Sequence, residues 1–185
     1  DHGTVASLFA AGAFQMASGQ PASRIARWDG LSWNAVGSGV NATIYDMTVF
    51  DDGTGPALIV AGSFTQAGGV AAARIAKWDG TTWSTLDEGF NDTVRALVVF
   101  DDGTGPALYA GGDFTHSGND LIRWMAKWDG ENWSSIDGSP NAEVYAFEQF
   151  DDGAGNALYV GGRFSHADGQ LMRRIARWDG DVWSP

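Results

Sequence analysis

Apolar and polar positions alternate over short runs along the chain, and turn-forming residues separate these runs. The stretch EVYAFEQF at 143–150 alternates roughly and is rich in residues that favour β-strands. The stretch DDGAGN that follows it has the chemistry of a turn. No segment has a helical period. The predicted elements are strands at 143–150, 157–164, 171–178 and from 182 onward, separated by a turn at 151–156, a loop at 165–170 and a tight Asp-Gly hairpin at 179–180.

This pattern of four strands recurs every 50 residues without a gap. Each copy carries two tryptophans, and each copy has a phenylalanine ahead of them. The aligned residues are Trp28, Trp78, Trp128 and Trp178; Trp33, Trp83, Trp133 and Trp183; and Phe14, Phe64, Phe114 and Phe164. Duplication of one unit explains this regularity. We expect a single domain over 1–185, divided into repeats 1–50, 51–100, 101–150 and 151–185.

Four antiparallel strands in a repeat of this length predict the blade of a β-propeller. The fold class expected is therefore all-β, with four four-stranded blades. Each periodic tryptophan would bury ~150–250 Å² between neighbouring blades, so these residues are interpreted as core. The glycine pairs Gly111-Gly112 and Gly161-Gly162 would let the second strand pass close to an aromatic ring of a neighbour.

The motifs ALYVGG at 157–162 and IARWDG at 175–180, with a second tryptophan at Trp183, resemble a kelch-type blade. The longer run FDDGTGPALYAGG resembles the propeller repeats that abound in large secreted or surface-associated bacterial proteins, notably those of planctomycetes. The resemblance covers essentially the whole chain. It implies a propeller fold and a location outside the cell or at its surface, and it implies no particular activity. Trp124 departs from the pattern, because the other repeats have arginine at its position.

The strand count predicts an incomplete blade. The chain begins at Asp1, without an initiator methionine and within a turn, so the first repeat lacks its first strand and a mature or excised piece is expected. The strand near 7–13 would then have an unpaired apolar edge. Three solutions stay open: the remainder of a larger propeller completes the ring, a second copy does so by self-association, or four blades close with one strand missing.

Composition excludes several partners. The net charge is −12, with 23 acidic and 11 basic residues, which argues against nucleic-acid binding and against anionic membranes. No apolar run is long enough to span a bilayer. The chain has no cysteine, which excludes disulfides, thiolate metal sites and cysteine nucleophiles. It also excludes a copper-radical oxidase of the kelch-like class, which needs a cysteine cross-linked to tyrosine.

Paired aspartates in the turn between the first two strands are the candidate metal site. Oxygen ligands in acidic glycine turns can hold Ca²⁺. The DDGTG motif lacks the alternating spacing of recognised Ca²⁺ loops, however, so a hairpin turn is the main interpretation and a Ca²⁺ cofactor the alternative. The Asp of each WDG motif is interpreted as a turn former. The candidate metal ligands are Asp51, Asp52, Asp101, Asp102, Asp151 and Asp152, with Asp1 at the matching position.

The loops between the second and third strands vary most between repeats, and variable loops on a rigid framework are where binding usually occurs. His116 and His166 are equivalent there and could share a metal or act as acid and base, although the other two repeats lack histidine. Trp124 could stack on a sugar ring or mark a protein contact, with packing as the alternative. The candidate ligand-binding residues are Trp124, His116, His166, Asp120 and Gln170.

Motifs for catalysis are missing from the sequence: it contains no GxSxG, HExxH, Walker or dinucleotide-binding pattern. We therefore expect a non-enzymatic scaffold or protein-interaction module, with protein or glycan ligands, that works outside the cell or at its surface. The alternative is a carbohydrate-binding, lectin-like propeller with near-equivalent sites on successive blades. A hydrolase or lyase with an acidic site is a third candidate, which near-identical repeats disfavour because catalysis needs one asymmetric site.

Overall fold

A computed structural model describes residues 7–153 and 155–185, and these residues are all-β. The described strands build four successive antiparallel sheets, and a short two-stranded hairpin lies between two consecutive strands of each sheet. Asp1 lies outside the described residues. In the part of the chain that the structure describes, no helix is long and apolar enough to cross a membrane.

The four sheets, numbered 1 to 4 along the chain, share one strand order. Within each sheet the strands lie side by side in the order in which the chain reaches them. Their bounds are: sheet 1, β1 (Leu8–Ala11), β4 (Ile25–Trp28) and β5 (Trp33–Ala35); sheet 2, β6 (Ile44–Asp51), β7 (Pro56–Gly62), β10 (Ile75–Trp78) and β11 (Trp83–Ser84); sheet 3, β12 (Val94–Asp101), β13 (Pro106–Gly112), β16 (Met125–Trp128) and β17 (Trp133–Ser135); sheet 4, β18 (Val144–Asp151), β19 (Asn156–Gly162), β22 (Ile175–Trp178) and β23 (Trp183–Ser184).

Sheet 1 has three strands among the described residues, as the strand count predicted. Strand β1 pairs only with β4, so no described strand pairs with its other edge. The hairpin between the third and fourth strands differs slightly from the expectation. Trp178 pairs with Trp183, which makes the connection a four-residue turn rather than a two-residue one.

Hairpins replace the loops that the sequence predicted between the second and third strands. The expectation of a loop at 165–170 was wrong, because Asp168 and Gly169 both have positive φ (47° and 70°) and close the two-residue turn of a hairpin. The expectation of one strand over 171–178 was wrong for the same reason, since Leu171 belongs to the hairpin. The hairpin strands are β2 (Met16–Ala17) and β3 (Gln20–Pro21), β8 (Gln66–Ala67) and β9 (Val70–Ala71), β14 (His116–Ser117) and β15 (Asp120–Leu121), and β20 (His166–Ala167) and β21 (Gln170–Leu171).

A residue with left-handed backbone separates each hairpin from the strand that follows it. Trp124 has φ +60°, and the arginines at the equivalent positions have φ between 66° and 69°. The backbone N–H of Trp124 donates to the carbonyl of Phe114, and its carbonyl accepts from the N–H of Gly112. These two bonds fix the chain reversal and explain why the third strand of sheet 3 begins only at Met125.

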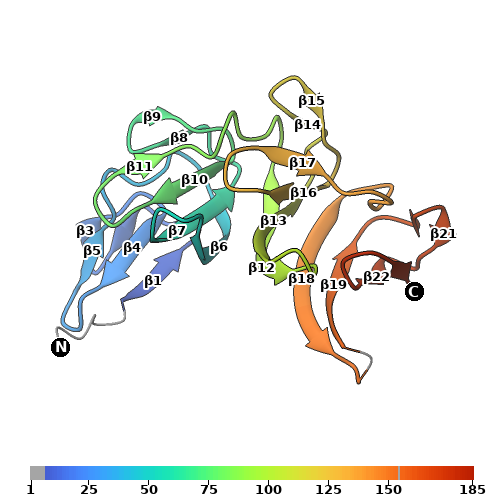
Figure 1. Cartoon of the computed structure of the whole chain (residues 1–185). Coiled ribbons are helices and arrows are strands. Elements are labelled where there is room, and N and C mark those ends of the chain that lie inside the picture. The colour runs from blue at the N-terminus through green and yellow to red at the C-terminus, as the bar shows by residue number, and fades with distance from the viewer. Residues whose placement is uncertain (1–6, 154) are drawn as a thin grey trace.

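The four sheets follow one another along an open arc, with sheets 1 and 4 at opposite ends (Figure 1). Strands β6, β12 and β18, the first strands of sheets 2, 3 and 4, are neighbours along this arc. Side chains join them: the backbone N–H of Leu97 donates to the Asp46 carboxylate at 2.8 Å, and the Gln149 amide donates to the carbonyl of Val99. The architecture is a repeat of blade-like sheets, and the described residues do not close into a ring.

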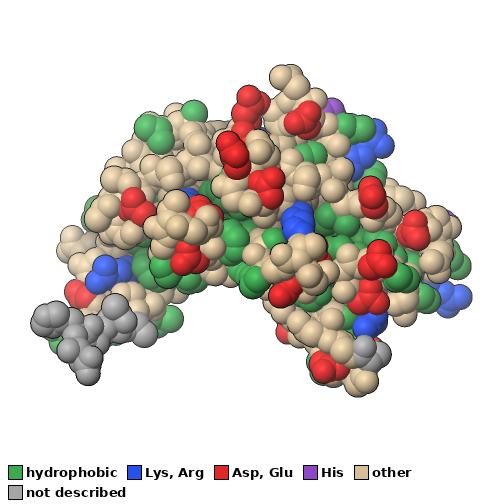
Figure 2. Space-filling view, viewed as in Figure 1, with side chains coloured by type: hydrophobic (Ala, Val, Ile, Leu, Met, Phe, Trp, Pro, Cys, Tyr) green, Lys and Arg blue, Asp and Glu red, His purple; other side chains and the backbone are tan. Residues whose placement is uncertain are grey.

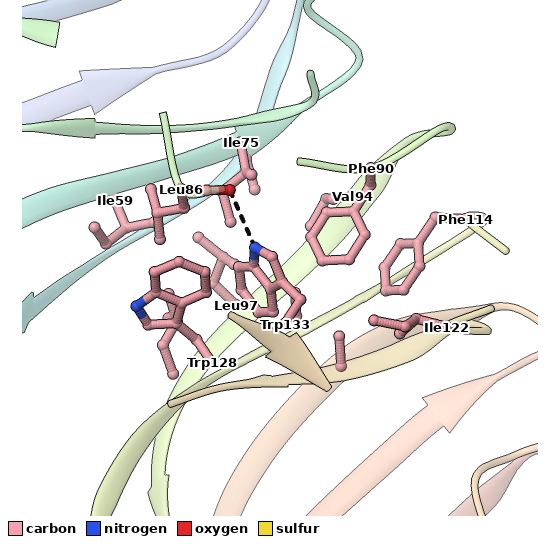
Figure 3. Packing of buried hydrophobic residues seen from close by; sticks show 14 of the residues in the cluster. Ile59, Ile75, Leu86, Phe90, Val94, Leu97, Phe114, Ile122, Trp128 and Trp133 are labelled. Atoms are coloured by element: carbon pink, nitrogen blue, oxygen red, sulfur yellow. Dashed lines mark hydrogen bonds between the residues drawn. The ribbon is translucent and has the colours of Figure 1, made fainter. Parts of the chain in front are cut away.

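The hydrophobic core lies between consecutive sheets rather than inside any one of them. Between sheets 2 and 3, Ile59 and Ile75 of sheet 2 pack with Trp128 of sheet 3 (Figure 3). The indole Nε1 of Trp133 donates to the carbonyl of Leu86 across this interface at 3.2 Å (Figure 3). Trp83 and Trp183 repeat this bond at 3.1 Å, to the carbonyls of Val36 and Asp137 respectively. The interpretation of the periodic tryptophans as core is confirmed where a preceding sheet covers them.

Gly111 confirms the prediction that a glycine admits a neighbour's side chains. A Cβ atom at Gly111 would lie 2.6 Å from Val144 Cγ1 and 2.8 Å from the Phe147 ring, both on strand β18 of the next sheet. The equivalent Gly161 has no following sheet, and its Cβ would meet nothing closer than Ala146 Cβ at 4.0 Å. The close approach at Gly111 therefore comes from the next sheet and not from its own strand.

Candidate functional site

The antiparallel topology sorts the connections of every sheet onto two ends. One end, the acidic end, carries the turns between first and second strands and those between third and fourth strands. The other end, the hairpin end, carries the hairpins and the connections that lead to the next sheet. The candidate metal ligands lie at the acidic end and the candidate ligand-binding residues at the hairpin end, as the sequence predicted.

At the acidic end, the first aspartate of each pair bonds to its own turn. Asp51 Oδ1 accepts the backbone N–H groups of Gly53 and Gly55, each at 2.9 Å. Asp101 and Asp151 make the same two bonds in their turns. The glycines have φ near +100°, a conformation that L side chains rarely adopt. These carboxylates therefore hold the turn, as the main interpretation of the motif required.

The second aspartate of each pair reaches across the sheet to a basic residue of the third strand. Asp102 Oδ2 lies 2.5 Å from Lys127 Nζ and accepts the hydroxyl of Tyr109 at 2.8 Å. Burial would raise the pKa of Asp102, but hydrogen bonds from Lys127, Thr104 and Tyr109 outweigh it and hold that pKa below its usual range. Burial and the bond to Asp102 raise the pKa of Tyr109. The matching ion pairs are Asp52 with Lys77 at 2.5 Å and Asp152 with Arg177 at 3.4 Å.

A calcium site at the acidic end stays a prediction. Within the described ranges, no group of three or more His, Asp or Glu side chains lies close enough to hold a metal ion. In the view of Figure 2 the acidic side chains are spread over several sheets instead of gathered in one patch. A groove of about 330 Å³ does lie between sheets 2 and 3 at this end, lined among others by Asp51, Asp52 and Lys127.

The WDG aspartates form turns, as predicted. Asp29 Oδ1 accepts the backbone N–H groups of Leu31 and Ser32, each at 2.8 Å, and these bonds, with help from Asn34, lower the pKa of Asp29 to about 2. Backbone bonds lower the pKa values of Asp79, Asp129 and Asp179 in the same way. These carboxylates are exposed and fully engaged in their own turns.

At the hairpin end, an asparagine from the connection ahead of sheets 2, 3 and 4 fastens the hairpin of each. Asn91 Oδ1 accepts the backbone N–H groups of Thr115 and His116, at 2.9 and 3.0 Å, and its Nδ2 donates to Thr115 Oγ1. Asn41 and Asn141 repeat the arrangement on the hairpins of sheets 2 and 4. This role was not predicted from the sequence, although the period of 50 marks the asparagines as equivalent.

The two histidines sit on separate hairpins in equivalent settings. His116 Nδ1 lies 2.9 Å from Thr115 Oγ1, and His166 Nδ1 lies 2.9 Å from Ser165 Oγ. In each case the hydroxyl belongs to the residue just before the histidine and also contacts the fastening asparagine. The geometry therefore gives each imidazole a local partner within its own hairpin, and a shared site for the two histidines stays a prediction.

The remaining candidate residues are placed differently from one another. Asp120 and Gln170 are exposed on their hairpins, opposite Ser117 and Ala167. Trp124 is half-buried and packs against the core between sheets 3 and 4, with the Arg123 guanidinium 5.9 Å from its ring centroid. This packing is the alternative that the sequence analysis kept open for Trp124.

An aromatic–arginine cluster at the hairpin end was not foreseen. Arg95, near the start of strand β12, lies with its guanidinium carbon 5.7 Å from the Tyr45 ring centroid and 5.0 Å from that of Tyr145. Asp113 holds Arg95 through two hydrogen bonds of 2.7 and 2.6 Å, which raise the pKa of the guanidinium. The rings belong to β6 and β18, so the cluster joins three sheets. Its signal in the sequence is the series Tyr, Arg, Tyr at one repeat position.

No protein-family model matches this chain, and comparisons with curated proteins and with solved structures found no match either. The resemblance to kelch-type repeats therefore stays a prediction.

Proposed function

We propose that the chain forms part of a β-propeller and acts as a non-enzymatic scaffold and protein-interaction module. The observation that carries this proposal is the same interface built three times between successive sheets. Each interface contains an indole hydrogen bond from the later sheet to a backbone carbonyl of the connection that follows the last strand of the earlier sheet. Stacking of this kind along an arc is how propeller blades are assembled, and ring closure with further blades is part of the proposal.

The hydrogen bonds and ion pairs of the polar side chains support the non-enzymatic character. The carboxylates of the acidic end bond to their own turns and to lysines or arginines of the same sheet. The histidines contact hydroxyls of their own hairpins. Each arrangement recurs with the repeat, whereas catalysis needs one asymmetric set of groups. A secreted or surface location accompanies this proposal as the implication of the kelch-like resemblance.

Small-angle scattering combined with light scattering tests the proposed architecture. The expected result is a particle whose distance distribution fits stacked sheets, at the chain mass of 19.6 kDa or an integral multiple of it. Turnover assays on polysaccharides and glycosides complete the test. A reproducible turnover that one Asp or Glu substitution abolishes would contradict the non-enzymatic proposal.

Glycan recognition is the second candidate function, and the aromatic–arginine cluster favours it. Tyr45 and Tyr145 keep 51 % and 39 % of their surface exposed at the hairpin end. Aromatic faces of this kind stack on the apolar faces of sugar rings, and the hydroxyl groups supply hydrogen bonds. Because Asp113 neutralises Arg95, the cluster suits an uncharged saccharide better than an anionic one.

A glycan array followed by titration tests this second function. The expected result is saturable binding that weakens about three- to tenfold for each ring removed by Tyr45→Ala or Tyr145→Ala. Trp124→Ala is the comparison, because Trp124 is packed against the core between sheets 3 and 4. If Trp124→Ala alone abolishes binding, the site lies at the hairpins instead of at the cluster. If no glycan binds, the second candidate is rejected.

A further inference from the structure

Each sheet has a leading face, toward the preceding sheet, and a trailing face, toward the next. Two of these faces have no partner among the described residues: the leading face of sheet 1, represented by Leu8, Trp28 and Trp33, and the trailing face of sheet 4, represented by Phe150, Tyr159 and Ile175. In Figure 1 they belong to the two sheets at the ends of the arc. Both faces carry residues that are core elsewhere in the chain.

The exposure of these residues, compared with that of their equivalents in other repeats, shows how much apolar surface the two faces leave uncovered. Leu8 is 59 % exposed on the leading face, while Leu58, Leu108 and Leu158 are 8 % exposed or less. On the trailing face Phe150 is 58 % exposed, and its equivalents Phe50 and Phe100 are 9 % exposed or less. Ile175, also on the trailing face, is 55 % exposed, and the residue at its position is fully buried in the other three repeats. Apolar side chains of this size left in water favour association.

The internal interfaces show what fits each face. Between sheets 3 and 4, the ring of Phe100 lies 5.8 Å from that of Trp178, and the ring of Tyr109 lies 5.5 Å from the same indole. Phe100 and Tyr109 belong to a trailing face and Trp178 to a leading face. Phe150 and Tyr159 are their equivalents on the open trailing face of sheet 4, and Trp28 is the equivalent indole on the open leading face of sheet 1.

We propose that the chain associates head to tail with a second copy of itself, the trailing face of sheet 4 in one copy packing on the leading face of sheet 1 in the next. This rests on the proposed propeller function and names the partner of its open ends. The contact continues an interface that the chain already makes three times, with the strands of sheet 1 in the next copy supplying Leu8, Trp28 and Trp33 at positions equivalent to those of the later sheets; sheet 1 has no described first strand to add to it. Phe150 and Tyr159 would then cover Trp28 of the next copy.

Head-to-tail packing differs from pairing along the free edge of β1. In head-to-tail packing the two copies use different surfaces, whereas two β1 edges would meet through the same surface on both copies. Net charge also affects the outcome, because each copy carries −12 and like charges repel at low ionic strength. Association is therefore expected to strengthen as the salt concentration is raised, because salt screens the charge repulsion between copies and leaves the apolar contact in place.

Light scattering on a sizing column with the full chain tests the proposal. The unmodified chain is expected to run above its 19.6 kDa monomer mass. Leu8→Asp puts a charge on the leading face, and Ile175→Asp puts one on the trailing face; each variant alone is expected to run as a monomer. An equal mixture of the two is expected to form a species of two chains, because one variant keeps an intact trailing face and the other an intact leading face.

Matched controls are Leu31→Asp and Val182→Asp. Both residues are exposed, at turns whose equivalents are exposed in every sheet, so both variants are expected to keep the mass of the unmodified chain. A monomeric unmodified chain at about 1 mM protein and high salt would overturn the proposal. So would association that persists in Ile175→Asp, or two monomeric variants that stay monomeric when mixed.

Near-ultraviolet circular dichroism separates failure of this proposal from failure of the proposed function. A monomer that keeps the signal of its buried tryptophans and unfolds cooperatively overturns the head-to-tail contact and leaves the stacked scaffold standing. A chain that lacks this signal has no stacked sheets, and that result contradicts both.

Discussion

Individual polar residues in this chain serve mainly to hold backbone and neighbouring strands. Asp102 is representative: its carboxylate takes bonds from Thr104 in its own turn, from Lys127 on the third strand and from Tyr109 on the second. Three elements meet on one side chain that is 9 % exposed. Such a buried and well-bonded carboxylate is ionised at neutral pH and contributes to stability there.

Asp102→Asn is expected to lower the free energy of unfolding at pH 7 by about 1–3 kcal/mol, because Lys127 loses its partner in a half-buried position. The folded-state pKa of Asp102 lies below its unfolded value of about 3.9. Its contribution is therefore complete above about pH 5 and is lost as pH falls through the folded-state pKa. Urea unfolding of both proteins between pH 7 and pH 3 measures this difference.

The control for this prediction is Asp181→Asn, an exposed carboxylate that belongs to a turn. Its substitution is expected to change the unfolding free energy by less than about 0.5 kcal/mol at any of these pH values. An Asp102→Asn deficit that stays constant down to pH 3 would show that packing, and not ionisation, causes the loss.

Among the elements, the two-stranded hairpins depend most on hydrogen bonds from other parts of the chain. A two-stranded hairpin of this length is not stable alone. Each of the three later hairpins is held by an asparagine from the preceding connection, as Asn91 holds the backbone of Thr115 and His116. The hairpin fold therefore depends on one side chain some 24 residues earlier in the chain.

Asn91→Ala is expected to loosen strands β14 and β15 without unfolding the sheets. The N–H groups of Thr115 and His116 lose their acceptor, so their amide hydrogens are expected to exchange about ten times faster, as loss of about 1–1.5 kcal/mol of local stability requires. Hydrogen exchange resolved by residue measures it. Asn132→Ala at an exposed turn is the control, with no change expected at these amides. Unchanged exchange in Asn91→Ala would mean that the turn alone holds the hairpin.

Strands β13 and β19 offer a matched pair of glycines. Gly111→Ala is expected to destabilise the chain by about 1–3 kcal/mol, because the new methyl group would collide with Val144 and Phe147 of the next sheet. Gly161→Ala is expected to be neutral or slightly stabilising, since its surroundings are open. Denaturant unfolding compares the two. Equal effects would show that strand propensity matters and contact between sheets does not.

At the scale of the whole molecule, stability comes from contacts between sheets. Each of the three core clusters joins two sheets, and the largest buried side chains lie in these clusters. A single sheet has no core of its own, as is usual for repeats that stack on their neighbours. The two end sheets accordingly have one covered face each, which is why residues there differ in burial from their equivalents in the middle sheets.

Trp133→Phe is expected to lower the free energy of unfolding by about 1–3 kcal/mol more than Trp33→Phe does, although the substitution is the same. Trp133→Phe leaves the carbonyl of Leu86 without a partner at a buried interface. Trp33 makes no such bond to a described residue, since no described sheet precedes it. Unfolding at low protein concentration, where copies are separate, measures the difference. Comparable losses would mean that the indole bond contributes nothing between sheets.

Much of the fold could be predicted from the sequence because the repeat states the local pattern four times. The strands, the two ends and the incomplete first sheet followed from periodicity and turn chemistry, and Gly111 followed from its position in the strand. The hairpins were missed although Asp168-Gly169 is a turn signal. The aromatic–arginine cluster was missed because Tyr45, Arg95 and Tyr145 are about 50 residues apart in sequence and meet only when three sheets stack.

The sequence alone therefore determined the repeat unit, its strands and the residues that hold its turns, since these depend on interactions within a few residues of the chain. Only the tertiary structure decided which equivalent residues are buried and which are exposed. Ile75 and Ile175 stand at the same position of the same motif, yet one is fully buried and the other is 55 % exposed. Their burial depends on whether another sheet packs against that face, and the local sequence does not determine whether such a sheet is present.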